Sequence, residues 1–178
     1  ITRIVASDFG PQSAKKGLEI LLATPDFPTT IAADPVRIEQ VVANLVDNAV
    51  KYTLSGKVEL GFSQSVDQDM REPQITLFIR DTGIGIPEKD LPQIFDKFHR
   101  CASIGPNPQS GAGLGLFIVR SFVEKQHGQI SVKSKPGRGT TFTLTFAAVE
   151  SNAVSKKPVI TSNLKRREKH GKKASTAR

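Results

Sequence analysis

The sequence predicts an α/β (α+β) two-layer sandwich, with helices packed on one face of a mixed, largely antiparallel sheet. Two segments, residues 34–52 and 114–127, show the three-and-four spacing of apolar residues that is typical of amphipathic helices. Five shorter runs rich in Val, Ile, Leu and Phe are typical of strands. Because helices and strands do not alternate regularly, the pattern favours a sandwich over a parallel sheet.

The first third of the chain contains one strand and one long helix. Residues 2–9 are expected to be the end of a helix whose beginning lies upstream, and residues 18–22 to be a strand. The long helix has a clear start, because Asp34 can cap it and Pro35 suits its first position.

Two strands are expected after this helix, over residues 57–65 and 74–80, with the polar segment 65–73 as their connecting turn. Residues 87–98 are expected to form a short helix. Pro92 limits that helix to about one turn on each side.

The last third combines a loop, a helix and a hairpin. Residues 99–112 are rich in Gly, Pro, Ser and Asn, which predicts a mobile loop. The helix over 114–127 is expected to stop at Gly128. The final strands, 129–135 and 140–146, are expected to pair as a hairpin.

The length of 178 residues fits one domain with an extension, since a single domain has roughly 100–200 residues. No apolar run approaches the roughly 18 residues of a spanning helix, and no charged-then-apolar leader opens the chain. We expect a cytoplasmic location for this part of the protein, whether its parent is membrane-anchored or soluble. The single cysteine, Cys101, excludes an internal disulfide and fits a reducing compartment. The chain begins at Ile1 rather than Met, and we expect it to be part of a longer protein.

The formal net charge of +8 lies entirely in the C-terminal tail. Residues 151–178 contain nine Lys and Arg residues against one acid, Glu168. This composition predicts disorder. A basic tail can bind nucleic acid or a membrane surface without specificity, but it is more often a solvated end, and no aromatic residue is interleaved to stack on bases. We therefore expect no specific nucleic-acid partner.

The sequence contains two glycine clusters. Residues 81–87 read Asp-Thr-Gly-Ile-Gly-Ile-Pro after a strand, and residues 111–116 read Gly-Ala-Gly-Leu-Gly-Leu before a helix. Glycine permits close approach of a ligand to the backbone, and a helix amino end suits phosphate. Each cluster alone is more often a turn. Neither matches a P-loop or a dinucleotide-binding fingerprint, so a nucleotide would bind in another way.

The long helix carries polar residues on one side. Asn44 and Asn48 are spaced i, i+4 and therefore share a face, and Lys51 follows one turn later. Amide oxygens suit Mg²⁺ and an ammonium suits phosphate. The alternative is that Asn48 satisfies a neighbouring backbone group and Lys51 is solvated.

Four motifs in this order are specific as a set: Asn-x-x-x-Asn-Ala-x-Lys-Tyr at 44–52, Asp-x-Gly-x-Gly-Ile-Pro at 81–87, Phe-x-x-Phe-His-Arg at 95–100 and Gly-x-Gly-Leu-Gly-Leu at 111–116. Together they resemble the ATP-binding domain of sensor histidine kinases. This domain has the Bergerat fold of the GHKL superfamily, which also holds DNA gyrase, heat-shock chaperone ATPases and mismatch-repair ATPases. The resemblance runs from about residue 18 to residue 146.

The resemblance implies that ATP is bound with its adenine at the first glycine box. Asp81 would accept a hydrogen bond from the adenine amino group. Guanine would be excluded because it carries an oxygen in place of that amino group. Gly83 and Gly85 would make room for the base and ribose. Ile86 and the hydroxyl of Thr140 would lie near the base.

At the phosphate end, the resemblance assigns Mg²⁺ coordination to Asn48, with Asn44 beside it facing the phosphates. Lys51 would contact phosphate, and Tyr52 would pack at the nucleotide. Arg100 matches an arginine that reaches the terminal phosphates in some members.

The mobile ATP lid would cover residues 103–110. Phe95 and Phe98 resemble the aromatic box that fixes one end of the lid, although both could equally be core residues. The second glycine box, whose N–H groups and following helix would hold the triphosphate, comprises Gly111, Gly113, Leu114, Gly115 and Leu116.

Asn44 departs from the pattern of the hydrolytic members and of the related serine kinases, which carry glutamate there. An amide takes up no proton near neutral pH and cannot serve as a general base. The nucleophile must therefore supply its own basicity, as a histidine imidazole does. We expect Asn44, Lys51 and Arg100 to assist phosphoryl transfer to histidine rather than ATP hydrolysis.

None of the three histidines, His99, His127 and His170, has the setting of the family's phosphoacceptor, which lies on a long helix before this domain. We therefore expect the chain to bind ATP·Mg without phosphorylating itself. Its expected partners are the dimerisation helices of a homodimeric parent kinase and a response regulator. The alternatives are a stand-alone serine kinase, which Asn44 argues against, a tail-driven nucleic-acid or membrane binder, and a degenerate pseudokinase, against which the intact motifs argue. The expected divisions are an upstream connector (1–16), the ATP-binding domain (17–148) and the basic tail (149–178).

Overall fold

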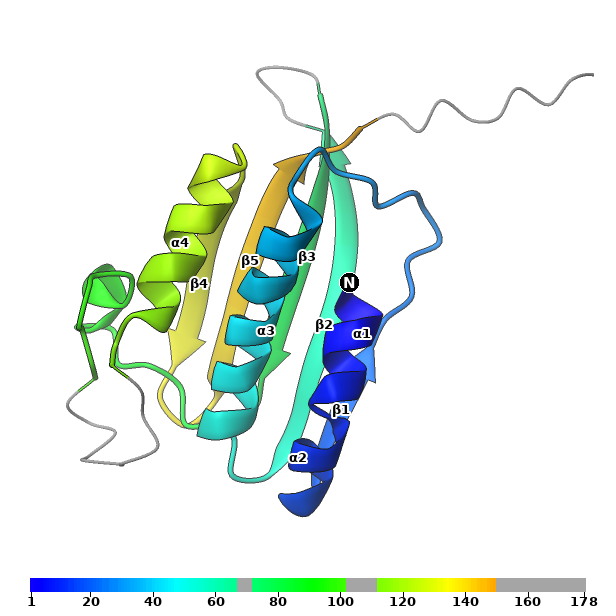
Figure 1. Cartoon of the computed structure of the whole chain (residues 1–178). Helices are drawn as coiled ribbons and strands as arrows, with labels where there is room; N and C mark the ends of the chain where they lie inside the picture. Colours follow the sequence, from blue (N-terminus) through cyan, green and yellow to red (C-terminus); the bar gives the residue numbers. More distant parts are fainter. Residues whose placement is uncertain (67–71, 102–111, 150–178) are drawn as a thin grey trace, which may run out of the picture.

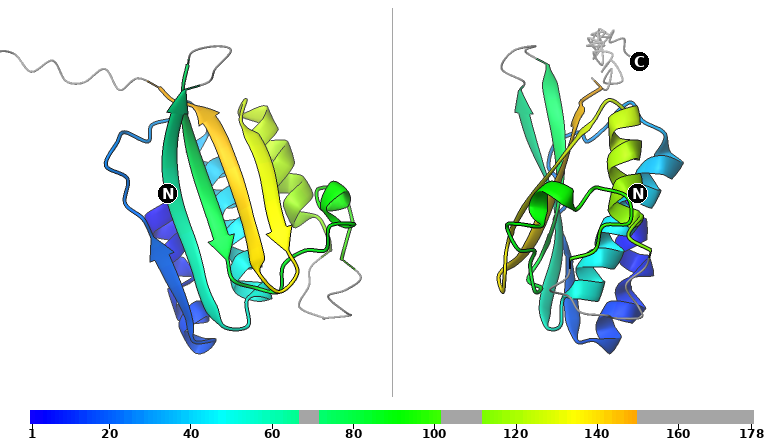
Figure 2. Two further views of the ribbon diagram at one scale, coloured as in Figure 1. Left: turned by 180° about the vertical axis from the view of Figure 1, so that it is seen from behind. Right: turned by 90° about the vertical axis from the view of Figure 1, so that its left-hand side faces the viewer.

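The computed structural model describes residues 1–66, 72–101 and 112–149. Its helices cover one face of a five-stranded sheet, so the fold has two layers and the predicted fold class is confirmed (Figures 1 and 2). The elements are α1 (Thr2–Asp8), α2 (Gly10–Lys15), β1 (Leu18–Leu22), α3 (Pro35–Tyr52), β2 (Gly56–Val66), β3 (Pro73–Asp81), the 3₁₀ turn η1 (Leu91–Gln93), α4 (Gly115–Lys125), β4 (Gln129–Lys135) and β5 (Gly139–Ala147).

The sheet has the strand order β1-β2-β3-β5-β4. β1 pairs with β2 in parallel, and the other three pairs are antiparallel, as expected for a mixed, largely antiparallel sheet. In the β3–β5 pair Arg80 lies opposite Thr141, so the next residue of β3, Asp81, reaches the start of β5 at Thr140. This register places two residues from distant parts of the sequence at one end of the sheet.

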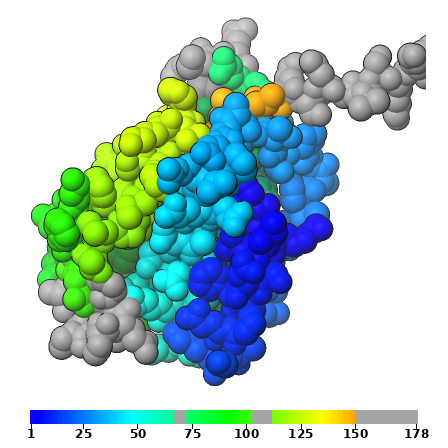
Figure 3. Space-filling model, viewed as in Figure 1, coloured from blue at the N-terminus to red at the C-terminus, as the bar shows by residue number. Residues whose placement is uncertain are grey.

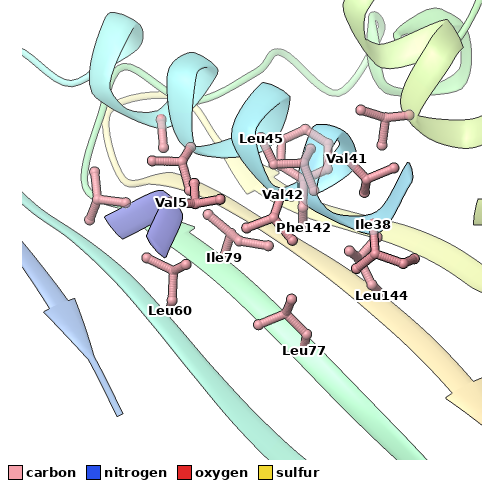
Figure 4. Close-up of a cluster of buried hydrophobic side chains, with 14 of the residues drawn as sticks. Val5, Ile38, Val41, Val42, Leu45, Leu60, Leu77, Ile79, Phe142 and Leu144 are labelled. Atoms are coloured by element: carbon pink, nitrogen blue, oxygen red, sulfur yellow. The ribbon is translucent and has the colours of Figure 1, made fainter. Parts of the chain in front are cut away.

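Helix α3 packs over the middle of the sheet (Figure 1). Its start is as predicted, because the Asp34 side chain accepts hydrogen bonds from the N–H groups of Val36 (2.9 Å) and Arg37 (3.3 Å). The helix buries one stripe of side chains against the strands, and Figure 4 shows these between the helix and the sheet. The buried residues of the stripe are Ile38, Val41, Val42, Leu45, Val46, Ala49 and Val50.

The strands supply the other half of the core through their alternation. Leu77 and Ile79 of β3 point to the helices, as do Phe142 and Leu144 of β5 and Leu60 of β2 (Figure 4). These aliphatic and aromatic side chains are almost fully buried, and truncating one of them to Ala would cost about 2–5 kcal/mol.

Helix α4 lies beside α3, and α1, α3 and α4 form much of the face seen in Figure 3. Two contacts join the helices at the N-terminal end of α3. The Asp34 N–H donates to Oε1 of Gln126 (2.9 Å), and the Arg37 guanidinium lies over the Phe122 ring (4.7 Å). None of the described helices combines the length and apolar character that a membrane-spanning helix needs.

The N-terminal segment differs from expectation by a second helix. α1 ends at Asp8, and α2 then follows with Pro11 in its first turn, where a missing N–H has no cost. Val5 of α1 is 2% exposed and belongs to the same core as α3 and the strands.

Two further expectations are corrected. Residues 87–98 are not a helix with a turn on each side of Pro92. They form a series of tight turns around η1, because their backbone hydrogen bonds span three residues, as in Leu91 N–H to Glu88 C=O (3.2 Å).

The end of helix α4 also differs from the prediction that Gly128 stops it. The left-handed residue after the helix is His127 (φ 57°), and not Gly128. Gly128 lies against the ring of Phe146, which a β-carbon at this position would overlap. The predicted lid (103–110), Gly111 and the tail from residue 150 lie outside the described residues. So does most of the connecting turn predicted at 65–73.

Candidate functional site

A cavity of about 360 Å³ opens at the end of the sheet where α3 ends, β3 ends and β5 begins. Its volume lies within the range of small-molecule sites, about 300–1,000 Å³. The sequence-predicted residues that line it are Asn44, Asn48, Lys51, Tyr52, Asp81, Gly85, Ile86, Arg100, Gly113, Leu114, Gly115, Leu116 and Thr140. Residues that line it but were not predicted are Asp47, Ala49, Ile84, Ile94, His99, Cys101, Ala112 and Phe142.

Asp81 is the buried carboxylate of this cavity. Its side-chain Oδ1 accepts hydrogen bonds from the N–H groups of Gly83 (2.8 Å) and Thr140 (3.2 Å). Burial raises the pKa of the Asp81 carboxyl above its ordinary value, and the two hydrogen bonds oppose that rise. Because both bonds end on Oδ1, Oδ2 is the oxygen left for a hydrogen-bond donor in the cavity.

Ser134 organises the residues around Asp81, although sequence reasoning did not single it out. Its Oγ accepts from the Ile86 N–H (2.7 Å) and donates to the Gly139 carbonyl (3.0 Å). It also lies 3.0 Å from the hydroxyl oxygen of Thr140. The strand alternation of β4, with Ile130 and Val132 inward, is the one signal that indicates Ser134 also faces inward.

Contacts within the protein already require glycine at two positions of the first cluster. Gly85 has a φ of +70°, and a β-carbon there would collide with the carbonyl of Lys135. A β-carbon on Gly83 would collide with the carbonyl of Tyr52. Gly83 does not line the cavity, and its contribution is the N–H group that holds Asp81.

The polar face of α3 forms another wall. Asn44, Asn48 and Lys51 all line the cavity, and all are half-buried. The Lys51 ammonium lies 5.4 Å from the centre of the Tyr52 ring. A β-carbon added to Gly115 would lie 3.9 Å from Oδ1 of Asn44, so this amide faces the first residue of α4.

The amino end of α4 closes the site opposite α3. Its N-cap residue, Leu114, makes no side-chain cap hydrogen bond. The first N–H groups of an α-helix have no intrahelical partner, and together with the helix dipole they suit an anion.

Phe98 and Gly113 flank the predicted loop 99–112 and contact each other. The N–H of Phe98 donates to the carbonyl of Gly113 (3.0 Å). The Phe98 side chain is 69% exposed and does not line the cavity, so the core interpretation of this residue is wrong. Phe95 packs against the core, with its ring centre 6.3 Å from that of Phe142 in an edge-to-face arrangement.

Two unexpected groups lie at the wall beside Arg100. Nε2 of His99 is buried without a hydrogen-bond partner among the described residues, a situation that costs about 1–3 kcal/mol. The Cys101 thiol lies next to the buried Asp90 carboxylate. Burial and then this carboxylate raise the pKa of Cys101, which keeps it protonated.

A divalent cation fits this donor set only in one way. Within the described part of the chain, no group of three or more His, Cys, Asp or Glu side chains is placed to hold a metal. An all-protein metal cage is therefore not offered here. The amide oxygens of Asn44 and Asn48 fit Mg²⁺, which takes one or two protein ligands and completes its shell with phosphates and water.

The comparisons with known proteins agree with this geometry. The family model described as "Histidine kinase-, DNA gyrase B-, and HSP90-like ATPase" matches residues 33–150. The signal transduction histidine-protein kinase BarA of Escherichia coli K12 is 39% identical over 131 residues, 73% of this chain and 14% of BarA. This chain therefore spans about a seventh of that relative.

Two solved structures have the same fold and more than a quarter of identical residues. Full-length ShkA in complex with AMPPNP matches with a TM-score of 0.69 and 32% identity, over 83% of this chain and 30% of ShkA. The nucleotide-free catalytic domain of the histidine kinase ThkA matches with a TM-score of 0.66 and 27% identity, over 82% of this chain and 90% of that domain.

The fold and the family match define the class: the chain belongs to the family of histidine kinase-, DNA gyrase B- and HSP90-like ATPases. Within that family its relatives are sensor histidine kinases, and it corresponds to their ATP-binding catalytic domain. The resemblance stated from the four motifs is thus confirmed.

Proposed function

We propose that this chain binds ATP·Mg in the cavity and presents the γ-phosphate for transfer to a histidine. The observation that supports this most strongly is Asp81. Its carboxylate is held by two backbone N–H groups on one oxygen, which leaves the other to accept the exocyclic amino group of adenine. Guanine carries an oxygen at that position, and two acceptors would face each other.

The phosphates would lie between α3 and the amino end of α4. Asn48 would coordinate Mg²⁺ through its amide oxygen, and Asn44 would face the phosphates beside it. Lys51 and Arg100 are the cations of the cavity wall, and they would offset charge that develops on the transferred group. Bound Mg²⁺ would supply further charge neutralisation at the phosphates.

The remaining residues would shape the site around the nucleotide. Tyr52 would pack at the nucleotide and Thr140 would lie near adenine, with Gly85 and Ile86 on the same wall. Gly113, Leu114, Gly115 and Leu116 would receive the triphosphate, as would Gly111. Gly83 and Phe98 would act through their backbones, since neither lines the cavity. Residues 103–110 would form the lid.

Transfer to histidine fits the side chain at position 44. An asparagine cannot remove a proton from water or from a serine hydroxyl, whereas an imidazole nitrogen attacks without such help. The acceptor would lie on the dimerisation helices of a homodimeric parent kinase, and a response regulator would receive the phosphoryl group. Two similarities support this proposal: BarA is named a histidine-protein kinase, and the similar structure of ShkA is a complex with AMPPNP.

We assign residues 17–148 to the ATP-binding domain, residues 1–16 to the connection with the upstream helices and residues 149–178 to a basic tail. The site of action would be cytoplasmic.

Phosphoryl transfer tests this function directly. The purified chain is incubated with γ-labelled ATP and Mg²⁺, alone and with the dimerisation helices of its parent kinase. We expect acid-labile label on those helices and none on this chain. Label on this chain alone, or acid-stable phosphoserine on the partner, would contradict the proposal. The second result would favour the serine-kinase alternative.

A further inference from the structure

Lys16 makes a contact that the proposed chemistry does not require. Its Nζ donates hydrogen bonds to the carbonyl of Val50 (2.8 Å) and to the carbonyl of Lys51 (3.1 Å). Lys16 follows directly after α2, whereas both carbonyls belong to the last turn of α3. The contact therefore joins the N-terminal segment to the end of the helix that carries the polar face.

The last four carbonyls of an α-helix lack intrahelical partners, and each needs another donor. In α3 all four are satisfied. The Ala49 carbonyl accepts from the backbone N–H (3.1 Å) and hydroxyl (2.6 Å) of Thr53, and the Tyr52 carbonyl accepts from the Ile84 N–H (3.1 Å). The two carbonyls between them, at positions 50 and 51, are those that Lys16 serves.

An ammonium group suits this place electrostatically. The C-terminal end of a helix carries partial negative charge, and a lysine near it bonds to the last carbonyls. Lys16 thus fixes the last turn of α3 from one side, while Ile84 of the first glycine cluster fixes it from the other.

The same turn presents two residues to the cavity, Lys51 and Tyr52. We propose that Lys16 is a positioning residue for nucleotide binding, which holds this turn so that both side chains meet the ligand. Through it the α1–α2 segment and nucleotide occupancy are coupled. A displacement of α2 weakens nucleotide binding, and bound nucleotide stabilises the contact. This inference rests on the proposed ATP·Mg function.

The test compares Lys16→Met with Lys15→Met, which removes the same charge from the adjacent position. Affinity for ATP·Mg is measured by calorimetry, and the folded fraction of each variant by urea unfolding. Tyr52 supplies a separate readout, because it is the single tyrosine in a chain without tryptophan. Quenching of tyrosine emission by acrylamide therefore reports on this turn alone, also without nucleotide.

We expect Lys16→Met to lower the affinity by about three- to tenfold and to increase Tyr52 quenching, with no such change in Lys15→Met. Lys16→Arg should keep the affinity and the Tyr52 quenching of the intact chain, since a guanidinium can also donate to two carbonyls. Unchanged Tyr52 quenching in Lys16→Met, or an affinity loss that follows only its unfolded fraction, would overturn the inference. An intact chain that binds no nucleotide would instead overturn the proposed function.

Discussion

The N–H of Phe98 donates a hydrogen bond to the carbonyl of Gly113 over 3.0 Å, and this bond joins the two residues that flank the predicted loop 99–112. Gly113 adopts a φ of +72°, and a β-carbon there would lie 2.8 Å from the His99 carbonyl oxygen and from the carbonyl carbon of Phe98. Backbone atoms therefore hold Phe98 and Gly113 together.

We predict that Gly113→Ala lowers ATP·Mg affinity by about tenfold, because the added methyl group separates Phe98 from Gly113 and moves the amino end of α4. The matched control is Gly137→Ala. Gly137 has a similar φ of +71° but no atom within 4 Å of the added carbon, and it lies outside the cavity. The left-handed backbone should cost each variant about 1–2 kcal/mol of stability, the overlap should add to this cost in Gly113→Ala, and calorimetry should show an affinity loss in Gly113→Ala alone. Equal affinities for the two variants would contradict this account.

Asp81→Asn should remove adenine recognition and keep the fold. The asparagine Oδ1 can still accept from Gly83 and Thr140, but its NH₂ group would face the adenine NH₂. An unpaired buried donor costs about 1–3 kcal/mol, so the affinity should fall by about ten- to a hundredfold. Asp26→Asn, an exposed carboxylate between β1 and α3, is the control and should bind as the intact chain does.

The raised pKa of Asp81 also predicts a pH dependence of stability. Between its ordinary value of 3.8 and the higher value in the fold, the folded state binds more protons than the unfolded state. The contribution of this group is therefore fully present below about pH 3.8 and is lost as the pH rises through the folded pKa. Urea unfolding should show the stability difference between the intact chain and Asp81→Asn falling with pH. A difference that rises with pH would be inconsistent with a desolvated carboxyl.

Asn48→Ala tests the metal site. Because the amide oxygen would be the main protein ligand of Mg²⁺, its loss should weaken ATP binding about tenfold or more in the presence of Mg²⁺. In the presence of a chelator the two proteins should bind alike. Gln40→Ala removes an exposed amide from the same helix and should change neither value. An equal effect of Asn48→Ala with and without Mg²⁺ would assign the residue to direct nucleotide contact.

Much of the fold could be predicted because local signals and tertiary packing agree. The Asp34-Pro35 start and the apolar stripe define α3, and alternation defines β3 and β5. Helix α2 was missed because the Gly10-Pro11 pair is typical of a turn, and only the structure shows proline in a first helical turn.

The cavity-lining residues that belong to sequence motifs could be predicted, whereas isolated residues with a structural role could not. Ser134 and Lys16 belong to no motif, and their roles depend on partners brought close by the sheet and by helix packing. Lys16 lies 34 residues from the first carbonyl that it serves. No periodicity or spacing in the sequence indicates a contact of this kind.

The most direct test of the account is a calorimetric titration of the intact chain with ATP·Mg and, separately, with GTP·Mg. A pocket organised around the Asp81 carboxylate predicts one site per chain for ATP·Mg and binding of GTP·Mg that is weaker by about tenfold or more. No binding of ATP·Mg, or equal affinity for the two nucleotides, would contradict the account.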